Sequence, residues 1–121
     1  MGCIDGMLVW TNKPNKASLL KCDMGPLKFL CGRKKKFGLN LQAICDHNRK
    51  FIDVFIGFPG SSSDFLCYCN STICEKLNTP GFLLPGMCIY GDAAYANNLA
   101  MCVPYKSVSN GPKDAYNFYQ S

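Results

Sequence analysis

Residues 37–59, FGLNLQAICDHNRKFIDVFIGFP, are the stretch that decides the fold. Between positions 37 and 43, apolar side chains alternate with small or polar ones, which is the two-residue period of a β-strand. Residues 51–58 are almost continuously apolar, as expected for a strand nearer the centre of a sheet. The polar segment 46–50 between them is short, so the two strands are predicted to form an antiparallel hairpin.

The segments on either side of this hairpin extend the prediction to a mixed α/β sheet. Upstream, we expect a strand at residues 3–11 and then an irregular insertion at about 12–32, rich in Pro, Gly and Lys. Downstream, the pattern predicts a helix at 62–77 with Ser and Asp at its start, and then a fourth strand at 87–90 that reaches Asp92. An apolar segment of undecided type follows at 97–105, and a second helix is expected to start at 114. Three antiparallel strands, a helix and a fourth strand fit a ribonuclease H-like arrangement in one domain, residues 1–121.

Two aspartates, Asp5 and Asp92, each adjoin a glycine at an apolar strand, and their placement needs an explanation. A carboxylate beside a buried strand costs several kcal/mol unless a partner or a metal ion compensates its charge. A turn role for Asp5 and a capping role for Asp92 are the alternatives, and spacing alone leaves both open. Asp46 and Asp53 are interpreted as a turn acid and a strand acid without a part in catalysis.

Length and composition describe one domain with a sizeable core. A chain of 121 residues buries roughly 65% of its unfolded surface, and 48% of the residues are hydrophobic. The net charge of +5 is compatible with a polyanionic partner without requiring one. Four bases, Arg33, Lys34, Lys35 and Lys36, precede the hairpin and are either a solvated start of a strand or a contact for phosphate groups. No secretory pattern and no membrane-length apolar stretch is present, so neither secretion nor a membrane partner is expected.

Nine cysteines in one small domain is an unusual number. Cys67, Cys69 and Cys74 come closest to a zinc-binding spacing, but on a helix only Cys67 and Cys74 would share a face. Most of the nine lie in apolar runs, where a free cysteine behaves as a small hydrophobic residue. Reduced core thiols are therefore the favoured interpretation, and a zinc site and secreted disulfides are the alternatives.

Five blocks occur in register along essentially the whole chain: CIDGMLVW, CGRKKKFGLNLQAICD, FIDVFIGFPGSSSDF, GMCIYGDAAY and KDAYNFYQS. This order of blocks resembles the catalytic domain of the PIF/Harbinger DDE transposases and the Harbinger transposase-derived nucleases. The resemblance implies a ribonuclease H-like fold in which two aspartates and a glutamate hold two divalent cations, Mg²⁺ or Mn²⁺. Such a centre cleaves and transfers DNA strands by a two-metal mechanism.

The resemblance assigns roles to particular residues. Asp5 matches the first acid, and Asp92, in Tyr-Gly-Asp-Ala-Ala-Tyr, matches the second; both are expected to bind metal on adjacent strands at the sheet centre. Asp64 matches the aspartate of a Gly-Ser-x-x-Asp block, an accessory position that is either a helix N-cap or a neighbour of the metal site. DNA is the implied partner, contacted in part by Arg33 to Lys36, and no small-molecule cofactor is implied.

The chain departs from the family pattern at the third acid. In the family a glutamate follows the Tyr-Asn-Phe-Tyr-x-Ser block on a helix, and here that block ends at Ser121. The only glutamate, Glu75, belongs to the wrong helix, and Asp114 belongs to a different block. The upstream helical DNA-binding region of such transposases is also missing, which makes a separate DNA-binding partner protein an expectation. The sequence is therefore expected to be a partial catalytic domain, truncated before the helix with the third acid.

Two functions remain in view. The first is the core of a metal-dependent DNA endonuclease or transposase, located in the nucleus with the cytoplasm as a second location. The second is an inactive transposase remnant that binds nucleic acid or a protein through its bases, namely Arg33, Lys34, Lys35, Lys36, Lys13, Lys16, Lys21 and Lys28. DNA cleavage that is lost in Asp5→Ala and Asp92→Ala supports the nuclease function. Salt-sensitive DNA binding that these two substitutions leave unchanged supports the binding function.

Overall fold

The structure, a computed structural model, describes residues 2–19, 24–108 and 110–120. Its elements, in chain order, are β1 (Gly2–Trp10), α1 (Lys16–Leu19), the 3-10 helix η1 (Pro26–Phe29), β2 (Leu30–Cys31), β3 (Lys36–Asp46), β4 (Phe51–Pro59), α2 (Asp64–Cys69), α3 (Thr72–Asn78), β5 (Ile89–Tyr90), β6 (Met101–Cys102) and α4 (Pro112–Gln120). The predicted hairpin is confirmed as β3 and β4. Its turn is closed by Asp46, whose Oδ1 accepts hydrogen bonds from the N–H groups of Asn48 and Lys50.

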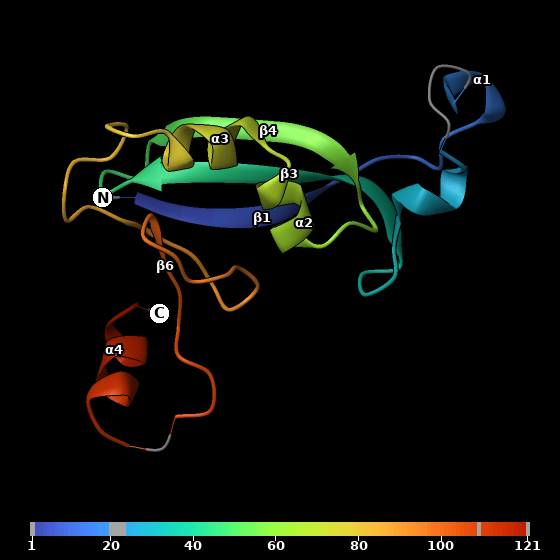
Figure 1. The fold of residues 1–121 in the computed structure, drawn as a ribbon. Helices are drawn as coiled ribbons and strands as arrows, with labels where there is room; N and C mark the ends of the chain where they lie inside the picture. The colour runs from blue at the N-terminus through green and yellow to red at the C-terminus, as the bar shows by residue number, and fades with distance from the viewer. Residues whose placement is uncertain (1, 20–23, 109, 121) are drawn as a thin grey trace.

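Strand β1 lies inside a six-stranded mixed sheet (Figure 1). It pairs antiparallel with β3 along its whole length and parallel with β5, which in turn pairs parallel with β6. Strands β4 and β2 both pair antiparallel with β3. The resulting order β4-β3-β1-β5-β6, with three antiparallel strands followed by two strands parallel to β1, is compatible with the ribonuclease H-like fold that the sequence predicted.

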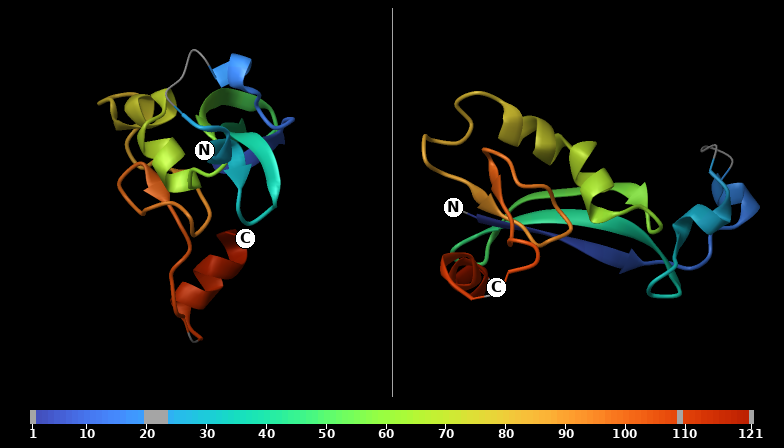
Figure 2. Two further views of the ribbon diagram at one scale, coloured as in Figure 1. Left: turned by 90° about the vertical axis from the view of Figure 1, so that its right-hand side faces the viewer. Right: turned by 60° about the horizontal axis from the view of Figure 1, so that its bottom comes forward.

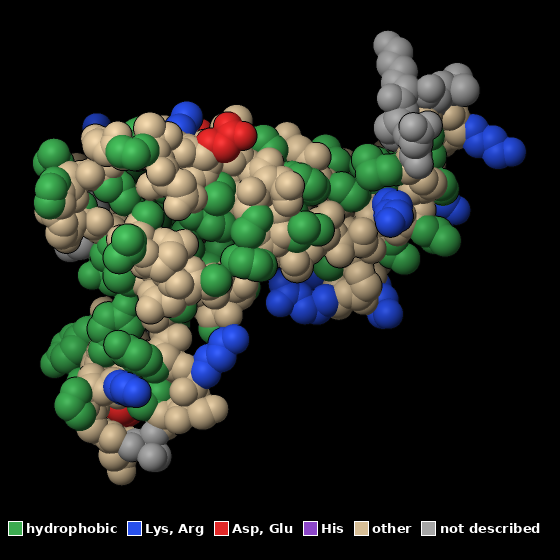
Figure 3. Space-filling view, in the orientation of Figure 1, with side chains coloured by type: hydrophobic (Ala, Val, Ile, Leu, Met, Phe, Trp, Pro, Cys, Tyr) green, Lys and Arg blue, Asp and Glu red, His purple; other side chains and the backbone are tan. Residues whose placement is uncertain are grey.

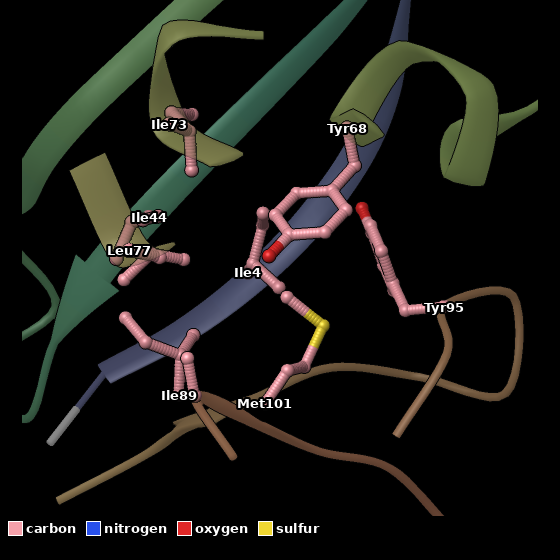
Figure 4. Close-up of a cluster of buried hydrophobic side chains, with 9 residues drawn as sticks. Ile4, Ile44, Tyr68, Ile73, Leu77, Ile89, Tyr95 and Met101 are labelled. Atoms are coloured by element: carbon pink, nitrogen blue, oxygen red, sulfur yellow. The ribbon is translucent and has the colours of Figure 1, made fainter. Parts of the chain in front are cut away.

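Helices α2 and α3 cover one face of the sheet and build the core there (Figure 2). The core contains one isoleucine from each of three strands: Ile4 on β1, Ile44 on β3 and Ile89 on β5. Around them gather side chains from the helices and the 95–101 segment, as Figure 4 shows: Tyr68, Ile73, Leu77, Tyr95, Ala100 and Met101. Because side chains alternate along a strand, the odd-numbered residues of β1 face away from this core.

The single helix predicted at 62–77 is wrong in one respect, because the structure divides it into α2 and α3. The break lies at Asn70 and Ser71. Ser71 has its own capping role: its Oγ accepts a hydrogen bond from the N–H of Cys74 at 3.2 Å and donates one to the carbonyl of Tyr68 at 2.7 Å. A serine that satisfies the N–H groups of a new helix favours a restart over continuation.

The prediction that residues 51–58 form a more central strand is also wrong. β4 pairs with β3 alone among the described strands and therefore lies at an edge of the sheet. Several of its large apolar side chains are exposed: Phe51, Ile52, Val54 and Ile56. The long β1–β3 pairing on the other edge of β3, together with the parallel β1–β5 pairing, places β1 at the centre instead.

The remaining segments project from the sheet. The 12–32 insertion contains α1 and η1 and extends beyond one end of β1, and Lys21 lies outside the described residues (Figure 1). Helix α4 stands on a separate arm and is tied back by Gln120, whose Nε2 donates to the carbonyls of Gly91 at 2.8 Å and Cys102 at 3.3 Å. Across the described segments, no helix is long and apolar enough to span a membrane.

Candidate active site

The two predicted acids lie beside neighbouring strands at the centre of the sheet. In the β1–β5 pairing Cys3 is opposite Tyr90, and the contact continues one residue further, since a Cβ on Gly91 would lie 3.3 Å from Cγ2 of Ile4. Asp5 follows Ile4 and Asp92 follows Gly91, so the two acids come directly after this contact. Both are exposed, and Asp5 belongs to the sheet face opposite the core.

Each of the two acids also makes a local contact with the backbone. Oδ1 of Asp5 accepts a hydrogen bond from the N–H of Gly6 at 2.7 Å, and Oδ1 of Asp92 accepts one from the N–H of Ala94 at 2.9 Å. The capping role considered for Asp92 is therefore present, in the turn that follows it. A carboxylate has about four acceptor positions, so one backbone contact orients it and leaves the second oxygen for another ligand.

Asp64 is not the N-cap of α2, and that alternative is wrong. Ser63 caps the helix, with its Oγ accepting from the N–H of Leu66 at 3.3 Å. Oδ1 of Asp64 instead accepts hydrogen bonds from two side-chain amides of β3, at 2.8 Å from Nδ2 of Asn40 and at 3.3 Å from Nε2 of Gln42.

These contacts belong to a longer hydrogen-bonded chain, the Asp64–Tyr95 network, which consists of Asp64, Asn40, Gln42 and Tyr95. Nε2 of Gln42 donates to Oδ1 of Asn40 at 2.7 Å, and the hydroxyl of Tyr95 donates to Oε1 of Gln42 at 2.6 Å. The side chain of Gln42 is fully buried, and Asn40 and Tyr95 are nearly so. Buried polar groups of this kind are stabilising only when they are paired, so the network fixes α2, β3 and the segment after Asp92 relative to one another.

Electrostatics link the network to the two exposed acids. Burial raises the pKa of Tyr95 far above its ordinary value, and the charges of Asp64, Asp5 and Asp92 raise it further. The phenol is therefore neutral at physiological pH and remains a hydrogen-bond donor. All three carboxylates, the two exposed acids and the partly buried Asp64, are therefore close enough to one hydroxyl to raise its pKa.

Gly6 contacts Asp5 on one face of the sheet and the Asp64–Tyr95 network on the other. A Cβ at position 6 would lie 2.2 Å from Oδ1 of Asp64 and 2.7 Å from Nε2 of Gln42. No side chain fits there without displacing the buried amide or the carboxylate. The glycine after Asp5 is thus required by the close approach of α2 to β1, and its N–H orients Asp5 on the other side.

The donor set fits a divalent cation in part. Asp5 and Asp92 offer two exposed carboxylates, which are the hard oxygen ligands that Mg²⁺ and Mn²⁺ prefer, with water and phosphate completing the shell. Over the described ranges, no three Asp, Glu, His or Cys side chains are grouped as a metal centre. Glu75 lies on α3 and Asp114 in the first turn of α4, both exposed, and neither joins the two acids.

A hollow of about 340 Å³ lies between the predicted basic run and Asp64, on the α2 side of the sheet. Arg33 and Lys34, in the turn between β2 and β3, line it on one side, and residues 60–65 line it on the other. Gly6 and Ala94 also line it, whereas neither Asp5 nor Asp92 does. Figure 3 shows one group of Lys and Arg side chains toward the right-hand end of the molecule, and others at the upper left and on the lower arm.

The last base of the run has a different environment. The Nζ of Lys36 lies 3.3 Å from the centroid of the exposed Trp10 ring, a cation–π contact at the end of β1. The basic run is therefore divided between the hollow and an exposed aromatic side chain. Both are features that fit a nucleic-acid backbone and its bases.

A sheet of this order, with one acid on its central strand and another after the neighbouring parallel strand, is compatible with the ribonuclease H-like class of protein. Residues 4–119 match the family model of the DDE superfamily endonucleases. The chain belongs to that family. No curated protein and no solved structure matches the chain.

The sequence did not identify the middle of the network. Asn40 and Gln42 alternate with apolar residues on β3, and the face that is fully buried is the one that carries these two amides. Tyr95 lies three residues after Asp92 in the same block. Two amides on alternate positions of a strand, opposite an Asp-Gly pair, are the signal that would have pointed to a buried polar network.

Most of the described cysteines are not buried in the core, although the sequence had predicted this for them. Of the eight in the described part of the chain, only Cys67 is buried, and burial followed by the charge of Asp64 raises its pKa to about 11. Cys3 and Cys69 are exposed, and the others are partly exposed; Cys22 lies outside the described residues. All eight are free thiols.

Proposed function

We propose that this chain is the catalytic core of a metal-dependent DNA endonuclease or transposase of the Harbinger type, with Asp5 and Asp92 as its metal-binding catalytic acids. The observation that carries the proposal is that these two exposed carboxylates follow directly on the contact between Ile4 of β1 and Gly91 after β5. Divalent cations bound there would polarise a phosphodiester and activate water or a 3′ hydroxyl by the two-metal mechanism.

The chain's own residues have distinct tasks in this proposal. Asp5 and Asp92 bind the cations, each oriented by a backbone N–H. The Arg33 and Lys34 side chains bind the DNA backbone. The Asp64–Tyr95 network holds the segment after Asp92 against β3, so Asp64 acts as a positioning residue. With DNA as the substrate, we also propose a nuclear location and a separate DNA-binding protein as partner.

A nicking assay tests the catalytic assignment. Supercoiled plasmid is incubated with Mg²⁺ or Mn²⁺ and with wild-type protein, Asp5→Asn, Asp92→Asn, or the matched control Asp114→Asn at an exposed acid outside the site. Unit charges 4 Å apart interact by about 4 kcal/mol at an effective dielectric of 20, so each of the first two variants is expected to lose about 1000-fold in rate. Equal losses in Asp114→Asn, or full cleavage by Asp5→Asn, would contradict the assignment.

A second candidate function is a nucleic-acid-binding module without catalysis, and the charge distribution favours it. Eight of the 13 Lys and Arg residues but one of the eight acids lie between positions 6 and 45. This segment alone has a net charge that is more positive than that of the whole chain. DNA binding that weakens with salt and is unchanged in Asp5→Asn, in the absence of any nicking, would support this function over the first.

A further inference from the structure

Two thiols on the paired strands β5 and β6 lie in direct contact. The Sγ atoms of Cys88 and Cys102 are 3.0 Å apart. Cys102 is on β6 and Cys88 directly precedes β5, whose Ile89 and Tyr90 pair with Met101 and Cys102. A disulfide bond is about 2.05 Å long, so a movement of about 1 Å would bring the two sulfurs to bonding distance. Both side chains are partly exposed, so a small oxidant can reach them.

The surroundings of this pair place it on the same sheet face as Asp5. Tyr90 is opposite Cys3 on one side and Cys102 on the other, so this row of side chains lies two residues before Asp5 on β1 and two residues before Asp92 in the chain. Helix α4 contacts the same row, because Tyr116, Tyr119 and Gln120 line a hollow with Cys3 and Tyr90. Asp92 itself lies within the 88–102 segment that a bond between the two sulfurs would close into a ring.

We propose that Cys88 and Cys102 are a reversible modification site, a dithiol that a low-molecular-weight disulfide such as oxidised glutathione converts to an intramolecular disulfide. The thiolate of one cysteine attacks the oxidant and forms a mixed disulfide, and one reduced thiol leaves. The second cysteine then attacks the protein sulfur of that mixed disulfide and releases a second reduced thiol. The two protein thiols lose two electrons and two protons, and the oxidant is reduced by the same amount.

The local chemistry predicts how fast this exchange proceeds. Burial, followed by the contact with Cys102, raises the pKa of Cys88. Because the thiolate is the attacking species, its small fraction at neutral pH makes the exchange slow there and faster as the pH rises. The 3.0 Å contact acts on the second step, since the partner sulfur is already in place when the mixed disulfide forms.

The sequence offers a direct readout of this bond. Cleavage after Lys76 and Lys106 gives a tryptic peptide, residues 77–106, whose only cysteines are Cys88 and Cys102. The purified chain is equilibrated with mixtures of reduced and oxidised glutathione in which the oxidised fraction increases. It is then alkylated and digested with trypsin without reductant, and the peptide masses are measured by mass spectrometry. We expect this peptide to lose two hydrogens and to take up no alkyl group, and to recover both alkylation sites after reduction.

Variants and competing products make the test decisive. Cys88→Ser and Cys102→Ser should each abolish the two-hydrogen loss, whereas the control Cys69→Ser, at an exposed thiol outside the pair, should leave it unchanged. The oxidised chain should also melt roughly 5–15 °C higher than the reduced chain, because a ring of this length restricts the unfolded state. Full alkylation of the peptide in oxidised glutathione alone, or a bond from either cysteine to Cys3, would overturn the proposal. The result is independent of the proposed nuclease function, since it needs neither metal nor DNA.

Discussion

The hydroxyl of Tyr95 offers a sharp test of the buried network, through the substitution Tyr95→Phe. The ring remains and keeps its edge-to-face contact with Tyr68, at 5.8 Å between centroids. Only the hydrogen bond to Oε1 of Gln42, 2.6 Å long, is removed. Because Gln42 is fully buried, water cannot replace the lost donor, and the amide oxygen is left unsatisfied.

The expected size of the effect follows from that orphaned acceptor. An unsatisfied buried polar group costs about 1–3 kcal/mol of the free energy of unfolding. For a domain of this size, 1 kcal/mol corresponds to a shift of roughly 3–6 °C in Tm, so Tyr95→Phe should melt about 5–10 °C below wild type. Urea unfolding followed by far-UV circular dichroism measures the same loss, and an unchanged m-value would show that the native surface is intact.

The pH dependence of this difference has a definite sign. The pKa of Tyr95 is raised in the folded state, whereas an unfolded tyrosine titrates near pH 10. The contribution of the neutral phenol is therefore fully present below about pH 10 and is lost as the pH rises above it, so the gap between wild type and Tyr95→Phe should narrow in alkaline buffer.

A matched control separates the network from a general effect of removing a hydroxyl. Tyr119 is 85% exposed, so Tyr119→Phe should change stability by less than about 0.5 kcal/mol. If Tyr95→Phe and Tyr119→Phe unfold at the same urea concentration as wild type, the buried hydrogen bond to Gln42 contributes nothing, and the reasoning about the network is refuted.

Four further outcomes are expected. Gly6→Ala places a Cβ 2.2 Å from the carboxylate of Asp64 and should destabilise the chain by about 1–3 kcal/mol in urea unfolding. Asp64→Asn keeps the acceptor oxygen, so plasmid nicking should persist; complete loss would indicate a metal ligand instead. The N–H of Lys50 holds the pKa of Asp46 below its usual value, so the stability advantage of wild type over Asp46→Asn should be complete at neutral pH and be lost progressively as the pH falls below about 4. The double change Arg33→Gln with Lys34→Gln should reduce the slope of log K against log[salt] for duplex DNA by about 2, measured by fluorescence anisotropy.

The sequence predicted the sheet well where short-range pattern and pairing agree. Alternation at residues 37–43 and the polar turn at 46–50 identified β3 and β4, because both features act within a few residues. Short-range pattern could not say which strand is central, since that depends on the pairing of β1 with β5 almost 90 residues later. The apolar run at 51–58 was therefore assigned to the centre, although β4 lies at the edge.

The candidate site was predictable in part for a similar reason. Asp5 and Asp92 could be chosen because acids next to apolar strands are costly and because the surrounding blocks resemble a known family. The amides of Asn40 and Gln42 could not, since polar residues at alternate positions of a strand usually face solvent. Here they face the core because a carboxylate on α2 needs buried donors, and the identity of that partner is fixed only once the helix is packed on the sheet.

Gly6 explains why the two halves of the site occur together. On one side of the sheet its N–H binds Asp5, and on the other its missing Cβ leaves the space that Asp64 and Gln42 occupy. A shift of α2 that displaced Asp64 would therefore press on the same backbone that orients Asp5. The partly buried Asp64 can thus influence the exposed Asp5 without touching a metal or a substrate. Asp64 can occupy its position only because residue 6 is a glycine. The Asp-Gly pair on β1 and the aspartate at the start of α2 therefore belong to one structural unit.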